Sequence, residues 1–400
     1  MPNFTGSLRS NEIFSAIYNM IISQRVFADN IKGSYAQLVD MARVDGSLYG
    51  DQKLFYSTDV LESVPWSDDN EASNLLSLSR PAAPKCQSII LDKFRQIRLT
   101  VDEYLSKRAW STEGAFSDFN SVMLGWIRDT KRVYDSTLYN AFIGTDVSAV
   151  GKQTVSIDLG TGSGHPLYNL SGVEKEQMTA MLIAQGLADL FVHMQDVSRD
   201  YNDYEQLRSY ELSGLKVIWN SKFVNKIKKI DLPTIFHKEG LMDKFEEHVL
   251  PERFFGIVIT SSNLSTYSAS TPITNKPIDS DDGAYTPGSN NANGCVRSLV
   301  EKSVTVSGTV YHIFPGDELP AGATIIASTG QFLPGEVYFA TSSDVICKIY
   351  EELPPIMSAF EVGTSFFNAR SLTTNHYITW GYNSLEHLKG KPCVTVKAAY

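Results

Sequence analysis

The sequence predicts an α+β fold that combines one very long helix with strands of several kinds. Ser111–Gly144 carries apolar side chains at helical spacing, with charged residues between them that leave one face exposed to water. From Arg95 to about Leu105, apolar and polar residues alternate as in a strand with one exposed face. After Val304, short strand-like segments are separated by turns rich in Pro and Gly. Helices and strands are therefore both expected, without the regular alternation of an α/β protein.

Composition sets limits on the class of protein. The 400 residues are 42% hydrophobic and 20% charged, which is typical of a globular protein with two or three cores. The net charge of −10 argues against a tight grip on nucleic acid, which requires clustered Lys and Arg, but allows passive proximity to DNA. No apolar run reaches the ~20 residues of a membrane span. The apolar segment near Ile13–Ile22 has no cleavage site after it, so a signal peptide is not expected.

The N-terminal third predicts two helices and a two-stranded ribbon. Ser10–Ala28 is amphipathic, and a shorter helix is expected at Ser34–Ala42. The first helix belongs either to the core or to an arm lying on a neighbouring subunit. A strand at Leu54–Leu61 leads through the Pro- and Ser-rich segment Ser63–Pro84 to the strand that begins at Arg95. A two-stranded ribbon is marginally stable alone, so it needs a partner surface.

The long helix is expected to begin and end at recognisable residues. Ser111 or Thr112 can cap its first turn, and Glu113 lies where the helix dipole favours negative charge. Gly144 is expected to close it in a left-handed conformation. A helix of this length spans roughly 45–50 Å, which suits a helix crossing a flat domain. We expect Trp126 on the apolar stripe to be packed against a sheet.

The remaining elements follow from similar patterns. A β-hairpin is expected at Thr154–Leu159 and Pro166–Leu170, around the turn Gly160–Gly164. A helix is expected at Glu174–Val197. It is followed by a strand at Leu215–Trp219, a short helix at Ser221–Lys228 and a second strand at Arg253–Thr260. Ser261–Gly294 has a loop composition. Short strands are then expected at Val304–Val310, Thr324–Ala327, Val337–Ala340, Tyr377–Tyr382 and Cys393–Ala398.

One stretch is similar to a cofactor motif. VSIDLGTGSG, Val155–Gly164, matches the first glycine loop of S-adenosylmethionine-dependent methyltransferases, where a strand leads into the loop and a helix begins directly. Here His165 and Pro166 follow, and no acidic strand end lies about 20 positions on. A hairpin turn is therefore the favoured interpretation.

No other pattern indicates a chemical site. The seven histidines and four cysteines (Cys86, Cys295, Cys347 and Cys393) form no metal-ligand spacing and no CxxC pair, so reduced thiols are expected. Glu246–His248 is interpreted as a charged helix face. Asp279–Gly283 resembles a calcium loop, but Gly283 and Asn290 stand where ligands are required. We expect no catalytic, cofactor-binding or metal-binding residues, and no enzymatic activity.

The order of these parts resembles the major capsid protein of tailed bacteriophages, the Hong Kong 97 fold. The stretches that carry the resemblance are Arg80–Trp110, Leu215–Ile227 and Phe366–Val396. The first is similar to the return of the family's extended loop before its spine helix, the second to its axial domain, and the third to its peripheral-domain strands. The chain departs from the family in its helical N-terminus and in an enlarged region from Ser261 to Gly335.

The resemblance implies a division of the chain into six parts. These are an N-terminal helical arm, an extended β-ribbon loop, a peripheral domain with the spine helix and hairpin, an axial domain, a β-rich insertion or surface loops, and a return to axial and peripheral strands. Their expected bounds are 1–53, 54–110, 111–172, 173–260, 261–335 and 336–400.

The resemblance also implies a mechanical function. Many copies would form hexamers and pentamers of an icosahedral shell that passively encloses double-stranded DNA. Portal, scaffolding and possible decoration proteins are the implied partners, without a membrane. The implied location is the virion, after assembly in the host bacterial cytoplasm. Two alternatives stay open: an encapsulin-like nanocompartment shell, and a methyltransferase based on VSIDLGTGSG.

Overall fold

The computed structural model describes residues 36–45, 50–63, 78, 80–102, 113–146, 153–228, 246–258, 296–298, 302–317, 319–320, 338–341 and 344–400. The helix expected at Ser10–Ala28, most of Ser63–Pro84, the stretch 279–283 and the strand expected at Thr324–Ala327 lie outside these residues. The chain divides into two compact units. The first contains Met1–Asp51, Leu91–Ser136 and Ile356–Ser384, and the second contains Gln52–Ile90, Thr137–Pro355 and Leu385–Tyr400.

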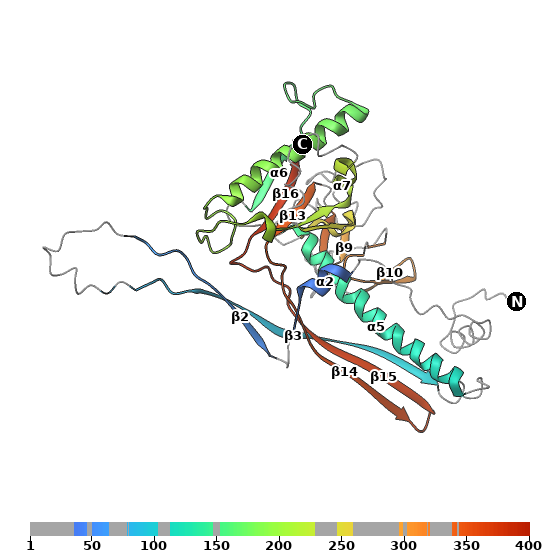
Figure 1. Ribbon diagram of the computed structural model, residues 1–400. Helices are drawn as coiled ribbons and strands as arrows, with labels where there is room; N and C mark the ends of the chain where they lie inside the picture. Colours follow the sequence, from blue (N-terminus) through green and yellow to red (C-terminus); the bar gives the residue numbers. More distant parts are fainter. Residues whose placement is uncertain are drawn as a thin grey trace. The chain divides into compact units, whose positions relative to one another are not determined.

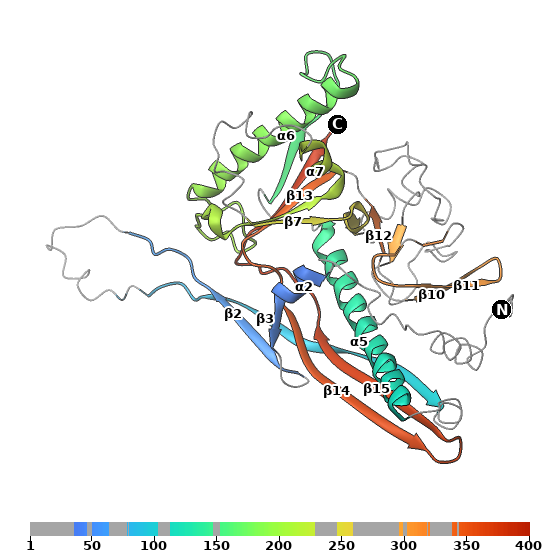
Figure 2. The same ribbon diagram turned by 45° about the vertical axis from the view of Figure 1, so that its right-hand side comes forward.

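A five-stranded sheet of long strands dominates the first unit (Figure 2). Its order is β1-β14-β15-β3-β2, and only the pair of β1 with β14 is parallel. The helix α2, Gln37–Ala42, confirms the expected short helix before the first strand. The strands are β1 (Arg43–Asp45), β14 (Ile356–Asn368), β15 (Thr373–Asn383), β3 (Lys85–Asp102) and β2 (Gln52–Ser57). Strand β2 and the start of β3 belong to the second unit.

Strand β3 confirms the alternation seen in the sequence and extends it. Gln96, Arg98 and Thr100 are exposed, while Ile97 and Leu99 are half-buried. The exposed side chains bond across to β15: Gln96 Nε2 donates to Thr379 Oγ1 at 3.0 Å, and Thr100 Oγ1 donates to an Asn375 side-chain oxygen at 2.6 Å. Such cross-strand pairs stabilise an antiparallel sheet.

The long helix α5, Glu113–Gly144, is confirmed. In the first unit its Tyr134 packs edge-on against Trp380 of β15, with ring centroids 6.2 Å apart. Arg95 of β3 lies 3.9 Å over the Tyr134 ring. Ile127, Tyr134 and Ala141 of the predicted apolar stripe are buried, and Trp126 is partly buried. The packing of Trp126 against a sheet stays a prediction, because helical spacing alone does not select which of two neighbouring apolar residues is the more deeply buried.

The second unit contains a mixed five-stranded sheet with a helix along one face (Figure 1). Its order is β5-β16-β13-β6-β7, in which β5 pairs with β16 and β6 with β7 in parallel. The helix α6, Gly172–Gln195, confirms the second predicted helix, and a shorter one, α7, spans Ser221–Lys228 as expected. The strands are β5 (Thr154–Asp158), β16 (Cys393–Ala399), β13 (Val345–Tyr350), β6 (Lys216–Asn220) and β7 (Glu246–Leu250).

The core of the second unit lies between this sheet and α6. Buried residues of α6 recur every three or four positions, which places them on one face of the helix. They pack against alternate residues of the strands, including Val217, Ile349 and Val394. The buried helix residues are Ala180, Ile183, Ala184, Leu187, Leu190, Phe191 and Met194.

The C-terminal end of α5 is capped by buried side chains of β13. Lys348 Nζ donates to the Thr145 carbonyl, and Tyr350 Oη donates to the Ile143 carbonyl at 3.4 Å. A cation there also interacts favourably with the helix dipole. Gly144 does not have the left-handed conformation that we expected. Glycine is needed because a Cβ would lie 1.9 Å from the backbone oxygen of Phe254.

The predicted hairpin at Thr154–Leu159 and Pro166–Leu170 is wrong in its second half. Strand β5 pairs with β16, and residues 163–169 form consecutive turns instead of a strand. These turns bring Leu167, 1% exposed, into the core. The helix face expected at Glu246–His248 is also wrong, because these residues begin β7, where His248 is buried with Nε2 3.1 Å from Glu246 Oε1.

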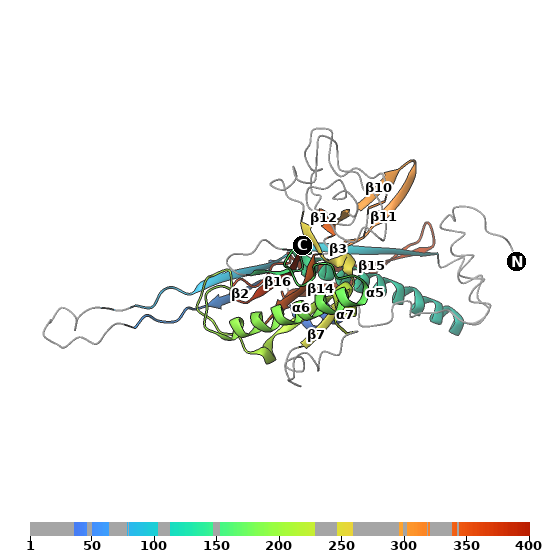
Figure 3. The ribbon, with the colours of Figure 1, turned by 90° about the horizontal axis from the view of Figure 1, so that it is seen from above.

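Two smaller sheets complete the second unit (Figure 3). One has the order β4-β8-β12-β9, and the other is the hairpin of β10 and β11. The single strand expected at Val304–Val310 is two strands, because Ser307 and Gly308 both have positive φ and turn the chain back. The strands are β4 (Thr145–Asp146), β8 (Gly256–Val258), β12 (Tyr338–Thr341), β9 (Val296–Ser298), β10 (Lys302–Val306) and β11 (Thr309–Ile313).

Candidate functional site at the base of the β2–β3 strand pair

Strand β2 is an edge strand that leaves apolar side chains exposed. It pairs with β3 alone among the described strands. Leu54 and Tyr56 of β2 are exposed, Tyr56 to 64%, and so is Ile90 of β3. Exposed apolar edge strands favour pairing with other chains, and proteins usually protect them. The strand pair is therefore suited to contact with another chain.

The end of β2 is held by side chains of the loop that follows α6. The Ser57 hydroxyl and the Gln206 side-chain oxygen are hydrogen-bonded, and Gln206 Nε2 donates to the Ser57 carbonyl at 3.1 Å. Arg208 Nη2 donates to Ser57 Oγ at 3.2 Å, to the Thr58 carbonyl and to Gln206 Oε1 at 3.1 Å. These contacts fix where the strand leaves the second unit.

Asp59 continues this network just beyond the strand. Arg199 Nη1 lies 2.6 Å from its Oδ2, and the backbone N–H groups of Leu207 and Val60 donate to its Oδ1 at 3.0 and 2.8 Å. The hydrogen bond from Arg199, followed by those from Leu207 and Val60, lowers the pKa of Asp59 from 3.8 to about 2. Asp59 is therefore ionised throughout the physiological range.

Strand β3 is held by the backbone of the segment before β16. Gln87 Nε2 donates to the His387 carbonyl at 2.8 Å, and Gln87 Oε1 accepts from the Lys389 N–H at 2.9 Å. Gly390 packs directly on β2, where a Cβ would lie 2.8 Å from Ser57 Oγ. Both strands are thus anchored within the second unit.

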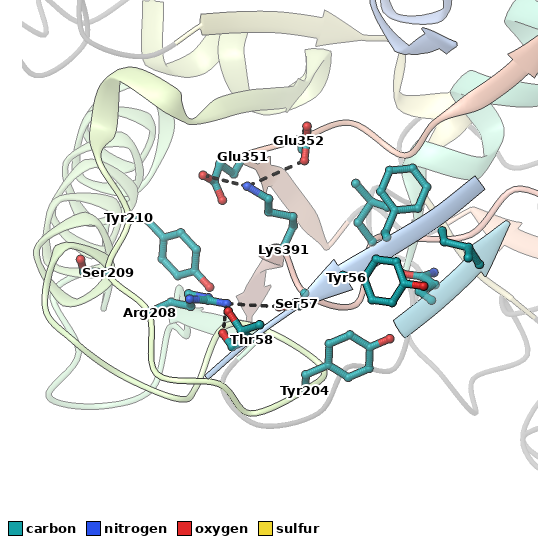
Figure 4. Close-up of a pocket in the computed structure, with 15 residues that line it drawn as sticks. Tyr56, Ser57, Thr58, Tyr204, Arg208, Ser209, Tyr210, Glu351, Glu352 and Lys391 are labelled. Atoms are coloured by element: carbon teal, nitrogen blue, oxygen red, sulfur yellow. Dashed lines mark hydrogen bonds and ion pairs between the residues drawn. The ribbon is translucent and has the colours of Figure 1, made fainter. Parts of the chain in front are cut away.

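A pocket of ≈ 490 Å³ opens beside these anchors (Figure 4). It lies between β2 and the loops that carry residues 204–210, 351–352 and 388–391. Its lining is mixed: Phe55, Tyr56, Tyr204 and Tyr210 contribute aromatic rings, and charged and polar side chains make up much of the rest. The volume is within the range of about 300–1,000 Å³ that is usual for binding pockets.

Lys391 is paired with two carboxylates of the pocket, so these three side chains carry a net charge of −1, which the positive charge of Arg208 balances. Lys391 Nζ lies 3.2 Å from Glu351 Oε1 and 3.8 Å from Glu352 Oε2 (Figure 4). Arg208 has no carboxylate within ion-pair distance among the described residues. Its Nε and Nη1 groups make no hydrogen bond within the described chain, since all its bonds there involve Nη2. The guanidinium thus keeps unused donors.

Tyr210 provides a second unused donor. Its side chain is buried, and its hydroxyl has no hydrogen-bond partner among the described residues. The nearby Asn202 side chain is already bonded to the backbone of Gln206 through both its nitrogen and its oxygen. Figure 4 shows the Tyr210 hydroxyl pointing toward Arg208.

The protonation state of Tyr210 suits a donor. Burial raises the pKa of Tyr210 to about 12, against smaller opposing effects of Asn202 and Arg208, so the hydroxyl keeps its proton. The hydroxyl exposes almost no surface, and Tyr210 belongs to the hydrophobic core of the second unit, so an acceptor from outside does not reach it in this conformation. The partly buried Arg208 guanidinium can donate to an acceptor, and we identify no activated nucleophile among the described lining residues.

The glycine stretch that was similar to a methyltransferase loop is used by the fold itself. Asp158 Oδ1 accepts from the Gly160 N–H at 2.9 Å and lies 3.7 Å from His165 Nε2. The next helix begins only at Gly172, after several turns. A cofactor loop of that class requires a helix that starts directly after the glycines. The geometry of this stretch is therefore that of a connecting turn.

The histidines do not form a site with the acidic residues. Among the residues that the structure describes, no group of three or more His, Cys, Asp or Glu side chains could hold a metal ion. His387 instead stacks between Phe142 and Tyr350, with ring centroids 4.6 and 5.8 Å away. Burial, and then the charge of Lys348, lowers its pKa to about 3, so it is neutral at physiological pH. Cys393 Sγ lies 3.6 Å from its Nδ1.

Sequence patterns did not identify the pocket. Its residues come from segments that are distant in the chain and make no motif. The one local signal is the run YNDYEQLRSY, residues 201–210, in which three tyrosines and an arginine occur in a stretch of low apolar content. Such a run resembles a binding surface as much as a loop.

The described helices include none that is long and apolar enough to cross a membrane.

Comparison with known proteins gives similarity of structure without similarity of sequence. No family model matches the sequence, and no curated protein does. The fold is similar to a chain in the capsid structure of Staphylococcus phage Andhra, with a TM-score of 0.56 and 10% identity over 94% of this chain and 87% of that one. It is also similar to a chain in the structure of the head fibre and inner core protein gp22 of native bacteriophage P68. There the TM-score is 0.54 and the identity 9%, over 99% of this chain and 88% of that one. The chain therefore has a fold found in phage capsid structures.

Proposed function

We propose that this chain is a structural subunit that self-assembles into the icosahedral head shell around a phage double-stranded DNA genome. The observation that carries the proposal is the similarity of nearly the whole chain to a phage capsid chain. Similarity over nearly all of both chains favours a shared architecture over a shared local motif. The expected partners are other copies in hexamers and pentamers, together with portal, scaffolding and possible decoration proteins.

The surface of the subunit supports this function. Apolar side chains are exposed on β2 and β3, and Phe366 and Phe367 are exposed near the end of β14. Exposed apolar strands are unfavourable in an isolated monomer and favourable where another copy covers them. Closed symmetry lets many weak contacts of this kind produce one stable shell. The net charge of −10 fits a shell that encloses DNA without binding it tightly.

Assembly of the purified chain tests the proposal. We expect pentamers, hexamers or closed shells in electron micrographs and by size-exclusion chromatography with light scattering. Particles made in the presence of the phage packaging machinery should have the absorbance ratio of DNA-filled heads. Shells that instead enclose protein cargo would favour a nanocompartment. A chain that stays monomeric at all concentrations and salt conditions would contradict the proposal.

Deletion of residues 67–79 from the ribbon tests its role in assembly. The deleted residues lie between the anchored ends of β2 and β3, so the core of the second unit should fold unchanged. If the ribbon contacts a neighbour, stable shells should be lost while the melting temperature of the subunit stays the same. Shells as robust as those of the full chain would show that the tip makes no essential contact.

A further inference from the structure

His387 lies where three elements of the second unit meet. Its ring stacks between Phe142 of α5 and Tyr350 of β13, and its Nδ1 lies 3.6 Å from Cys393 Sγ of β16. The residue as a whole is partly buried, but its Nε2 exposes almost no surface and has no hydrogen-bond partner among the described residues. One ring nitrogen thus faces a weak partner, and the other faces none.

This environment does not accommodate a positive charge on the ring. A protonated imidazole donates a hydrogen bond from both nitrogens, and Nε2 meets no acceptor in the described chain. The charge that acts on the ring is that of Lys348 on β13, which is fully buried and has the same sign as a protonated histidine. Tyr350 stays neutral, because burial raises its pKa.

The neighbouring carboxylate does not neutralise such a charge. Glu386, which precedes His387 in the chain, has its Oε2 3.5 Å from Gln87 Nε2. The ion pairs of histidine within the described residues are those of His165 and His248. A proton on His387 would therefore be buried without a counter-charge, which folded proteins avoid.

The segment that carries His387 also holds both strands of the β2–β3 pair. We name residues 387–390 the anchor segment. The His387 carbonyl accepts from Gln87 Nε2 at 2.8 Å, and the Lys389 N–H donates to Gln87 Oε1 at 2.9 Å. Gly390 packs so closely on β2 that a Cβ would lie 2.8 Å from Ser57 Oγ. Because the His387 ring and carbonyl belong to one residue, a ring that leaves its stack disturbs the bond to β3.

We propose that the anchor segment is an acid-sensitive latch: as the pH falls, the His387 ring takes up a proton, leaves its stack and releases the Gln87 side chain of β3. The anchor segment, β2 and the start of β3 all belong to the second unit. The inference concerns the single subunit and goes beyond the proposed shell function, so either can fail without the other.

The pH range of the latch follows from linkage. The pKa of His387 is about 3 in the folded chain, below its ordinary value of 6.5, so the opened segment takes up the proton first. The closed latch is fully favoured above pH 6.5 and loses stability as the pH falls toward 3. The equilibrium constant for opening should rise roughly tenfold for each pH unit within this interval. Asp59 acts only below its ordinary pKa of 3.8 and is therefore separable.

Hydrogen exchange of the full chain between pH 6.5 and 4.5 tests the latch. The readout is the protection factor of the amides of residues 85–90, which corrects for the intrinsic pH dependence of exchange. We expect protection in the parent chain to fall by roughly tenfold or more across this range. The amides of α6 should keep their protection. A parallel loss of protection in α6 would indicate general acid unfolding and would overturn the inference.

Neutral variants assign the effect to His387. His387→Phe keeps a ring in the stack but cannot take up a proton, so protection of residues 85–90 should stay level. His387→Gln is a second neutral variant, which serves if the phenyl ring does not fit beside Cys393. His193→Gln changes an exposed histidine in the last turn of α6, and this control should retain the pH dependence of the parent. Constant protection in the parent, or the same acid loss in a folded neutral variant, contradicts the latch.

Discussion

The two five-stranded sheets are stabilised in different ways. In the second unit the central strand β13 is buried at every position from Val345 to Tyr350. In the other sheet, β3 is exposed at most positions along its length, and β14 exposes Phe366 and Phe367. The sheet with β13 is therefore stabilised by a hydrophobic core. The sheet with β3 and β14 is stabilised more by hydrogen bonds between long strands, and it leaves apolar side chains exposed to water.

The largest effect expected from this difference comes from paired truncations. Ile349→Ala in β13 removes a fully buried side chain and should destabilise the chain by about 2–5 kcal/mol. Phe366→Ala removes a larger but 63% exposed side chain, so its cost should stay within about 0.5 kcal/mol. Chemical denaturation measures both. Equal destabilisation would show that the long sheet has a core of its own.

Two glycines of α5 provide a second comparison, one in each unit. At Gly144 a Cβ would lie 1.9 Å from the Phe254 oxygen, so Gly144→Ala should cost about 1–3 kcal/mol or more. A Cβ at Gly125 would have nothing within 4 Å of it among the described residues, so Gly125→Ala should stabilise the helix by about 0.5–1 kcal/mol. Thermal melts of the two variants should therefore shift in opposite directions. A shift in the same direction would contradict the close packing at Gly144.

Two lysines test the importance of burial for a cation. Lys348→Met leaves the Thr145 carbonyl at the end of α5 without its donor, and should cost about 1–3 kcal/mol. Lys93→Met on β3 removes a half-exposed lysine 3.6 Å from Asp92, where a surface ion pair contributes about 0–1 kcal/mol. Hydrogen exchange at the last turn of α5 should accelerate in the first variant alone. Unchanged exchange there would show that Lys348 does not cap the helix.

The smallest effect expected is a pH dependence at the base of the strand pair. The folded pKa of Asp59, about 2, lies below its ordinary value of 3.8. Its contribution is therefore fully present above that ordinary value and is lost as the pH falls through the folded pKa. Pepsin cleavage near residues 58–63 should increase across that interval in the parent chain. In Asp59→Asn it should be high throughout, and parallel curves for the two chains would refute the assignment.

The sequence predicted an element correctly where a single hydrophobic pattern runs through the whole segment. The helices α5 and α6 have long apolar stripes, and β3 alternates cleanly from Arg95 onward. Prediction missed β13 because Lys348 interrupts an otherwise apolar run, and its burial depends on a carbonyl 203 residues away in the chain. The start of β3 was missed because Ile89, Ile90 and Leu91 are consecutive apolar residues that hide the alternation.

The candidate site could not be predicted for a related reason. The unused donors of Arg208 and Tyr210 are evident only once the chain has brought Ser57 and Lys391 beside them. No local pattern tells which hydroxyl is left without a partner, because partners come from distant segments. The edge position of β2 likewise follows from the pairing of strands and not from its own residues.

The position of β16 has a consequence for how the protein is made. This strand, Cys393–Ala399, lies inside its sheet, between β5 and β13. Strands β5 and β6 leave the ribosome long before it, and during that time β5 has no neighbour in the sheet. The sheet therefore cannot close co-translationally until residue 399 has emerged from the exit tunnel. Contacts this distant in sequence make folding slow. A chain truncated before β16 therefore leaves β5 and β13 without the strand that joins them.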